Sequence, residues 1–264
     1  MSYLGKKGYS ILKSDLTIKE ELFIRNELTV KAFVPKSPVQ PEAFPVYRES
    51  PKKFYMPRYF GVNTFGDFTE NKLSLGEDIN LEFQGELREY QVNIVNKYIN
   101  AVKDSGGGLL DVDPGKGKTV MALDIIAKLK KKTLVIVHKS FLLNQWIERI
   151  QQFLPTARVG KIQGQIIMMR TITNYTLGLS GTMQRKDGLT KVFKMFLGDI
   201  VHKEKSNTSE HKVIVKAIHY SVEDPEFNEM KYDYRGNPLY STMISKLCNY
   251  NHRSEFIIKV LQTE

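Results

Sequence analysis

The stretch GGGLLDVDPGKGKTVMALDIIAKLKKK (106–132) contains the pattern that decides the fold. A glycine turn leads into GGGLLDVD (106–113), an apolar run that we expect to form a short buried strand. The loop DPGKGKT (113–119) follows, and VMALDIIAKLKKK (120–132) has the apolar spacing of an amphipathic helix with a basic end, which suits the helix dipole. A strand, a glycine-rich loop and a helix in this order are the context of a phosphate-binding loop.

The loop offers a chemical role for most of its residues. Glycines at 115 and 117 permit a tight turn that aims backbone N–H groups at phosphate oxygens, and the helix N-terminus adds positive potential. Lys118 would reach the β- and γ-phosphates, and the Thr119 hydroxyl would bind Mg²⁺. The longer consensus has glycine six residues before the lysine, where this chain has Val112. The alternative is a chance turn that contains lysine and glycine. The expected nucleotide-binding residues of the loop are Pro114, Gly115, Lys116, Gly117, Lys118 and Thr119.

Helical and strand patterns alternate around this loop. Apolar spacing predicts helices at 87–102, 140–154 (with Ser140 at the N-cap) and 189–199. Apolar runs predict strands at TLVIVH (133–138) and TLGLSGT (176–182), and RVGKI (158–162) is a further candidate. This alternation predicts an α/β fold with a parallel sheet.

The composition is that of a globular protein. The chain has 264 residues, of which 41% are hydrophobic and 26% charged, which excludes collagen-like, mucin-like and fully disordered chains. We find no apolar run long enough for a transmembrane helix and no secretory signal at the N-terminus. The single cysteine, Cys248, cannot form an internal disulfide, so we expect an intracellular setting.

The net charge of +10 is concentrated in one part of the chain. Residues 85–200 carry 18 basic and 9 acidic groups, whereas the segments on either side are close to neutral. A basic zone suits a polyanion, either a nucleotide or a nucleic acid, and the alternative is a lysine-rich solvated surface.

Proline divides the chain further. Six of the ten prolines lie between Pro35 and Pro57, which excludes a long helix or a central strand there and indicates an extended arm or a small β-rich module. Within it, VYRESPKKFYMPRYFG (46–61) mixes aromatic and basic residues that could stack on bases, or could pack against the next domain. We therefore expect an accessory module at 1–84, a nucleotide-binding domain at 85–200 and a partial second domain at 201–264.

Several ordered motifs together resemble superfamily 2 helicases. They are LREYQ, LLDVDPGKGKT, TLVIVHKSFLLNQW and LGLSGTMQRKDGL. The resemblance is closest to the XPB-like branch, which contains the helicase subunit of the eukaryotic transcription-and-repair factor and relatives in large DNA viruses. It covers most of residues 10–260 and implies RecA-like domains, ATP and Mg²⁺ as cofactors, and movement on DNA or RNA.

The resemblance also implies roles for residues outside the loop. Gln91 would read the adenine edge, although a polar position on an amphipathic helix is its alternative. Ser180, Gly181 and Thr182 match the Ser-Ala-Thr motif that couples nucleotide state to strand grip, with glycine in place of alanine. The nucleic-acid and coupling residues implied by the motifs are Lys139, Gln145, Ser180, Thr182 and Arg185.

One expected element is missing from the sequence. The family places an acidic pair at the end of a buried strand, where one carboxylate holds Mg²⁺ and the other activates water. Between Pro114 and Lys186 the only acids are Asp124 and Glu148, and neither follows an apolar strand. The stretch 163–175 is too short for a parallel strand with both of its crossovers, so we expect an internal deletion there. The C-terminal part similarly resembles only the start of a second RecA-like domain, with a strand expected at 212–220 and helices at 242–262, and we expect a truncation.

The sequence therefore predicts an ATP-binding helicase-family protein whose hydrolysis is impaired. We expect DNA as its partner, with RNA as an alternative, and no membrane. If the protein is viral, its location would be the host cytoplasm or nucleus. A non-catalytic nucleic-acid- or partner-binding module and a gene fragment remain alternatives.

Overall fold

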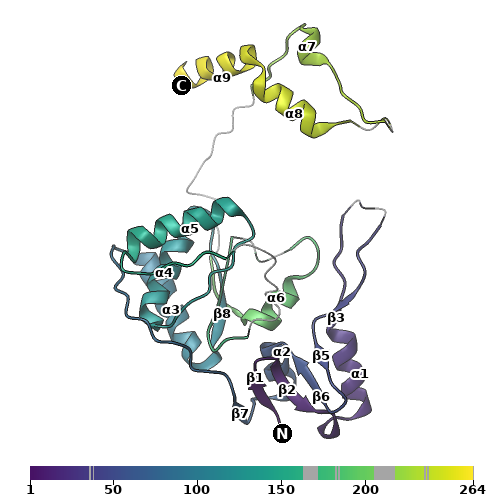
Figure 1. Cartoon of the computed structure of the whole chain (residues 1–264), viewed down its shortest axis with the longest axis vertical. Coiled ribbons are helices and arrows are strands. Elements are labelled where there is room, and N and C mark those ends of the chain that lie inside the picture. The colour runs from purple at the N-terminus through teal and green to yellow at the C-terminus, as the bar shows by residue number, and fades with distance from the viewer. Residues whose placement is uncertain are drawn as a thin grey trace. The chain divides into compact units, whose positions relative to one another are not determined.

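A computed structural model describes the chain except for residues 36, 38, 163–171, 182, 184, 205–217, 235, 237 and 264. The chain divides into two compact units, Met1–Ser206 and Asn207–Glu264, each of which is considered by itself. Figure 1 shows the elements of both units.

A parallel three-stranded sheet forms the centre of the nucleotide-binding part. Its strand order is β10-β8-β9, and both pairings are parallel. Helices α3, α4 and α5 lie on one side of β8 and α6 lies on the other (Figure 1). The bounds are α3 Glu89–Ser105, β8 Gly107–Asp111, α4 Lys118–Leu129, α5 Ser140–Phe153, β9 Thr176–Ser180, α6 Thr190–Leu197 and β10 Ile200–Lys203. The predicted α/β fold with an incomplete RecA-like sheet is confirmed.

The apolar spacing read from the sequence forms the core between α3, β8 and α4. Val95, Leu110 and Met121 are fully buried in this cluster. Helix α3 ends where Gly106 adopts a left-handed backbone with φ 75°, which favours glycine. The Tyr98 hydroxyl of α3 donates to the Thr176 carbonyl of β9 at 2.8 Å, which ties the helix to the sheet.

Four sequence-based expectations of local structure are wrong. The proline-rich stretch 35–57, from which a central strand was excluded, contains β6 (Lys53–Met56), which pairs with β5 (Arg48–Glu49) on one side and β2 (Gly8–Leu12) on the other. Residues 133–138 form no strand, and Leu134 is 53% exposed. Strand β8 is already paired on both sides, so a further strand could join only the outer edge of β9 or β10. Residues 158–162 are likewise not a strand. Ser140 is the first residue of α5, and Lys139 occupies the N-cap without a capping side-chain hydrogen bond.

The N-terminal part is a small β-rich module, as expected. Its five-stranded sheet has the order β5-β6-β2-β1-β7. Strands β3 and β4 form a separate two-stranded sheet. Helix α1 begins with a capping box in which Thr17 and Glu20 bond each other's backbone N–H. The bounds are β1 Tyr3–Gly5, β2 Gly8–Leu12, η1 Lys13–Asp15, α1 Ile18–Glu27, β3 Thr29–Val30, β4 Phe44–Pro45, β5 Arg48–Glu49, β6 Lys53–Met56, α2 Arg58–Phe65 and β7 Glu70–Asn71.

This module packs against the nucleotide-binding part. Val192 of α6 belongs to the same buried cluster as Phe54 and Phe60. Arg58 donates to the Asn174 carbonyl at 2.8 Å, and the Tyr59 hydroxyl lies 3.3 Å from Thr176 Oγ1. Within the aromatic and basic stretch 46–61, these side chains therefore pack against the neighbouring domain, which was the second of the two alternatives.

The described residues of the second unit include three helices, and the stretches between them are not helical. It contains α7 (Pro225–Asn228), α8 (Tyr240–Asn249) and α9 (Asn251–Thr263), which confirms the helices expected at 242–262. Rings of Tyr220, Phe227, Tyr250 and Phe256 pack together with centroids 5.1 to 5.4 Å apart. The strand expected at 212–220 lies mostly outside the described residues, so a second RecA-like domain stays a prediction. Across the described parts of both units, every helix is too short or too polar to cross a membrane.

Candidate nucleotide site

The glycine-rich loop lies at the carboxyl edge of the sheet. Asp111 ends β8 and is aligned with Ser180 of β9 on one side and with Lys203 of β10 on the other. Ligands of open parallel sheets bind at this edge, because the loops that follow the strands converge there. The structure thus places Ser180 beside the loop, as its motif implies.

Two glycines give the loop its shape. Gly115 has φ 80° and Gly117 has φ 77°, a region that side chains other than glycine rarely adopt. A Cβ on Gly117 would lie 2.4 Å from Gln91 Nε2, so the loop also needs glycine for close packing. Gly117 is the N-cap of α4 and supplies no side-chain cap, which leaves the first N–H groups of the helix available to an anion.

Lys118 folds back over the start of the loop. Its ammonium donates to the carbonyls of Val112 at 2.8 Å and Asp113 at 2.9 Å. Burial lowers the pKa of Lys118 below its usual value of 10.5, while the charges of Asp113, Glu204 and Asp111 act in the opposite direction. The ammonium is therefore partly desolvated, which strengthens its interaction with an incoming phosphate.

Two side chains at the start of α3 hold the glycine-rich loop by hydrogen bonds. Tyr90 Oη and Gln91 Nε2 both donate to the Lys116 carbonyl, at 3.1 and 2.9 Å. Gln91 Oε1 also accepts from the Arg88 N–H at 2.9 Å. The amide oxygen of a glutamine can accept two hydrogen bonds, and its NH₂ group can donate two. The oxygen and the NH₂ group of Gln91 therefore each have one hydrogen bond left that adenine could use. Its side chain is only 6% exposed, which makes Gln91 a support of the loop whatever else it contacts.

Glu204 is a residue of this site that the sequence analysis missed. It follows β10 directly, and its N–H donates to the Asp111 carbonyl at 2.9 Å. Its carboxylate accepts from the Asp113 N–H at 3.2 Å and lies 3.5 Å from Lys116 Nζ. Its position directly after IVHK (200–203) is the signal in the sequence that could have identified it.

The loop fits a triphosphate better than it fits a protein-bound metal. The left-handed glycines, the uncapped start of α4 and Lys118 match the phosphate groups. Thr119 stands in the first turn of α4, where its hydroxyl could join a Mg²⁺ ion held mainly by phosphates and water. Asp124 faces Lys128 on α4 at 2.6 Å, and Glu148 is exposed on α5. Among the described residues no group of three acids, histidines or cysteines could hold a metal.

The other predicted residues are dispersed around the site. Lys139 and Gln145 are exposed at the start and on the surface of α5. Thr182 lies outside the described residues. Gly181 is close to the loop, since a Cβ there would lie 3.0 Å from Pro114 Cδ and 3.6 Å from Lys118 Nζ. Glycine at position 181 therefore lets the segment after β9 approach the glycine-rich loop closely, whereas an alanine side chain would crowd Pro114.

Arg185 is engaged by its own segment. Its Nε donates to both carboxylate oxygens of Asp187, at 2.9 and 3.1 Å, and its guanidinium lies 5.0 Å from the Phe193 ring centroid. This pairing lowers the pKa of the Asp187 carboxyl to about 2. Because Arg185 is exposed and Asp187 is only half-buried, the pair shapes the loop before α6 more than it stabilises the fold.

Comparisons with known proteins identify the family. The sequence profile described as "Type III restriction enzyme, res subunit" (ResIII) matches residues 84–223, more than half of the chain. A putative ATP-dependent RNA helicase of Acanthamoeba polyphaga mimivirus is 30% identical over 97% of this chain and 59% of its own length. A putative helicase of Invertebrate iridescent virus 6 is 23% identical over 70% of this chain and 52% of its own length. The DNA 3'-5' translocase XPB2 of Sulfurisphaera tokodaii is 25% identical over 50% of this chain and 38% of its own length.

These alignments also reveal a difference in length. The chain spans between half and three-fifths of the first two relatives. The mimivirus alignment runs over 313 residues, more than the 264 of this chain, so the viral protein has residues inside the aligned stretch without counterparts here. That surplus agrees with the internal deletion expected from the sequence. The chain belongs to the ResIII helicase family, as a member of the XPB-like branch of superfamily 2 that is related to helicases of large DNA viruses.

Proposed function

We propose that this chain binds ATP with Mg²⁺ through its glycine-rich loop and acts on nucleic acid as a helicase-family protein with impaired hydrolysis. The position of Lys118 carries the proposal. Its ammonium lies beside the uncapped start of α4, at the edge of the sheet where Ser180 and Gly181 also arrive. When bound, Mg²⁺ would neutralise phosphate charge, and this chain would contribute the Thr119 hydroxyl and the cradle of backbone amides.

Impaired hydrolysis is proposed because the chain lacks the acidic pair of the family. One carboxylate of this pair would orient the attacking water opposite the γ-phosphate. Loss of such preorganised charge lowers the rate of hydrolysis by orders of magnitude. Asp124 and Glu148 do not replace the pair, since Asp124 is held by Lys128 and Glu148 points to solvent from α5. The expected state is a protein that holds ATP and turns it over slowly.

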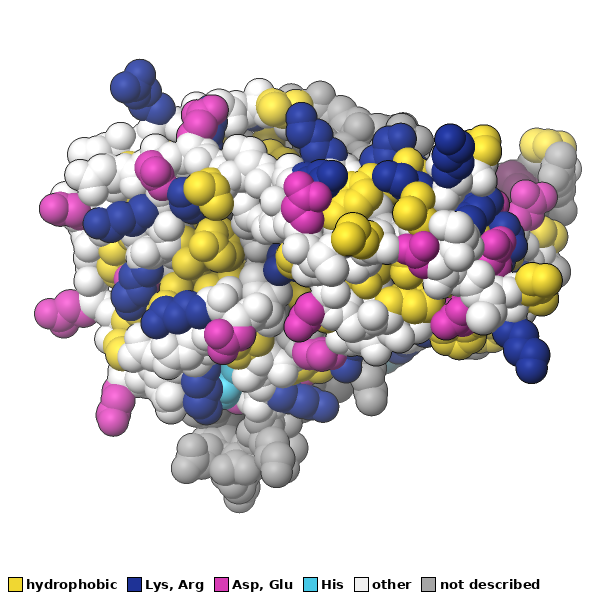
Figure 2. All heavy atoms as spheres, turned by 90° about the horizontal axis from the view of Figure 1, so that it is seen from below, with side chains coloured by type: hydrophobic (Ala, Val, Ile, Leu, Met, Phe, Trp, Pro, Cys, Tyr) yellow, Lys and Arg dark blue, Asp and Glu magenta, His cyan; other side chains and the backbone are white. Residues whose placement is uncertain are grey.

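The proposed nucleic-acid contacts are those implied by the helicase motifs. They are Lys139, Gln145, Ser180, Thr182 and Arg185, within a segment whose net charge is +9. On the face in Figure 2, Lys and Arg side chains alternate with Asp and Glu, so the positive excess is not gathered into one patch in that view. We also propose the three-part division at residues 84 and 200, and an intracellular location, which the single cysteine favours.

The test is an ATPase assay of the full chain with single-stranded DNA, with single-stranded RNA and without nucleic acid. We expect measurable ATP binding and turnover far below that of an intact family member, with the more stimulating polymer identifying the partner. Rapid DNA- or RNA-stimulated turnover that Lys118→Ala abolishes would refute the impairment. Absence of ATP binding would refute the nucleotide site.

A further inference from the structure

A second cavity lies in the N-terminal module, away from the glycine-rich loop. It has a volume of about 300 Å³ and opens to the surface. Its walls include two cationic side chains, two tyrosines and two apolar residues, and no acidic residue lines it. These six residues are Lys7, Arg48, Tyr47, Tyr55, Met56 and Phe196.

The strand register brings the polar part of this wall together. Arg48 of β5 lies directly opposite Tyr55 of β6, so their side chains project from the same face of the sheet. The Lys7 ammonium lies 4.8 Å from the Tyr55 ring centroid. Both tyrosines are partly exposed, so an entering ligand can reach a ring without unfolding the module.

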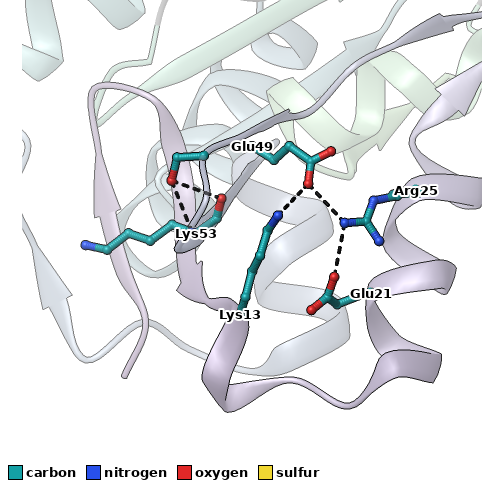
Figure 3. A network of polar contacts seen from close by, with 6 residues as sticks. Lys13, Glu21, Arg25, Glu49 and Lys53 are labelled. Carbon is teal, nitrogen blue, oxygen red and sulfur yellow. Dashed lines mark hydrogen bonds and ion pairs between the residues drawn. The ribbon is translucent and has the colours of Figure 1, made fainter.

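A cluster of cations elsewhere in the module is held by acidic side chains. Figure 3 shows Glu49 between Lys13 and Arg25, with distances of 2.7 and 3.0 Å, and Glu21 on the other side of Arg25. Those cations are neutralised within the protein. Among the described residues, by contrast, neither Lys7 nor Arg48 forms an ion pair with an acidic side chain, so both are available to an external anion.

Two uncompensated cations beside two tyrosines suit a flat ring that carries a phosphate. Single-stranded nucleic acids are bound in this way, with aromatic side chains stacked on bases and cations on the backbone. The volume is at the lower end of the range for ligand sites and limits the occupant to about one nucleotide unit. A base without phosphate would leave Lys7 and Arg48 unused, and a phosphate alone would leave the tyrosines unused.

We propose that this cavity binds one nucleotide of a single-stranded nucleic acid, with the base against Tyr47 or Tyr55 and the phosphate on Lys7 and Arg48. This inference rests on the proposed function, because it gives the nucleic acid a contact outside the helicase motifs. Phe196 comes from α6, so a strand held here would touch the N-terminal module and the nucleotide-binding part together.

The experiment measures binding of fluorescein-labelled single-stranded DNA and RNA oligonucleotides to the full chain at several salt concentrations. The test variant is Lys7→Gln with Arg48→Gln, two exposed positions whose change leaves the module folded. The matched control is Lys19→Gln, which removes an exposed charge from α1. We expect the double variant to bind about five- to tenfold more weakly and to lower the salt slope by about 0.7, because the contact with one phosphate is lost. We expect the control to stay within about twofold of the unmodified chain.

A second pair of variants isolates the stacking. Tyr47→Leu should weaken strand binding about fivefold or more, and Tyr47→Phe should retain it, because stacking needs the ring and not the hydroxyl. Unchanged affinity and salt slope in the Lys7/Arg48 double variant would overturn the proposal. Displacement of the oligonucleotide by AMP or dTMP at equal concentration would overturn the assignment to a strand and indicate a free mononucleotide instead.

Failure of this inference is distinguishable from failure of the nucleotide site. Lys118→Ala should weaken ATP binding about tenfold or more and leave the ATP-free affinity for the oligonucleotide intact. The Lys7/Arg48 double variant should do the reverse. Loss of ATP binding in the cavity variant would contradict two separate sites.

Discussion

The carboxylate of Glu204 accepts a hydrogen bond from the backbone N–H of Asp113, with 3.2 Å between the two atoms. Its other oxygen lies 3.5 Å from Lys116 Nζ. A residue at the end of β10 thus places a negative charge on the loop proposed to receive a triphosphate.

Glu204→Gln should bind ATP more tightly than the unmodified chain. Glutamine keeps an acceptor for the Asp113 N–H and removes the charge that repels phosphate and neutralises Lys116. A unit charge near the surface is worth about 1 kcal/mol, or roughly fivefold in affinity, and the gain should shrink at high salt. Isothermal titration with ATP and ADP measures this, with Glu82→Gln, an exposed acid elsewhere, as the control. Equal or weaker ATP binding by Glu204→Gln would contradict the account.

Gln91→Ala should reduce the preference for ATP over GTP. The variant removes the amide proposed to read adenine, and it also removes the support for the Lys116 carbonyl, at a cost of about 1 kcal/mol in stability. Tyr90→Phe is the matched control, because it removes the other hydrogen bond to that carbonyl and leaves the amide in place. Competition titrations with ATP and GTP give the ratio. An unchanged ratio in Gln91→Ala would limit Gln91 to a structural role.

Gly181→Ala should weaken ATP binding without unfolding the chain. The added Cβ would lie 3.0 Å from Pro114 Cδ, so the loop must shift by a few tenths of an ångström to accept it. We expect a loss of about two- to fivefold in affinity and a change in stability below about 1 kcal/mol. Gly160→Ala is the control, since its Cβ would meet open space. Affinity that equals the unmodified chain would mean that the loop accommodates the methyl group freely.

The affinity for ATP should begin to fall at a lower pH than it would if Lys118 had the ordinary lysine pKa of 10.5. Burial holds the pKa of Lys118 below 10.5, so the ammonium is lost as pH rises through that lowered value. The effect on folding has the opposite sign: burial of the charged amine destabilises the folded protein below the lowered pKa, and this cost disappears as the pH rises toward 10.5, so stability rises where ATP affinity falls. Titrations between about pH 7 and pH 10 measure the effect. Lys118→Arg, whose guanidinium stays charged, should show a flatter profile, and parallel profiles would contradict the assignment.

The sequence was sufficient for the parts of the fold whose interactions are local. The spacing of Ile94, Val95, Tyr98 and Val102 predicted the buried face of α3, and glycine positions predicted the loop that follows β8. Helix α1 was not predicted, although Thr17 and Glu20, three residues apart, carry the capping-box pattern that marks the start of a helix. Such features are decided by residues within a few positions of one another.

The predicted strand at 133–138 failed for a reason that local pattern does not contain. An apolar run becomes a strand only when a neighbouring strand accepts its backbone hydrogen bonds. Both sides of β8 are taken by β9 and β10, and residues 133–138 pair with neither of the outer edges that remain. The position of Glu204 at the glycine-rich loop was hidden for the same kind of reason. It depends on the parallel pairing of β10 with β8, which joins residues far apart in the sequence.

The most direct test of the nucleotide site is a titration of the full chain with a fluorescent ATP analogue in the presence of Mg²⁺. Loss of the charge-assisted contact of Lys118 should weaken binding about tenfold or more in Lys118→Ala. Lys103→Ala, which removes an exposed lysine from the last turn of α3, should bind as the unmodified chain does. Folded Lys118→Ala protein with unchanged affinity would contradict the account.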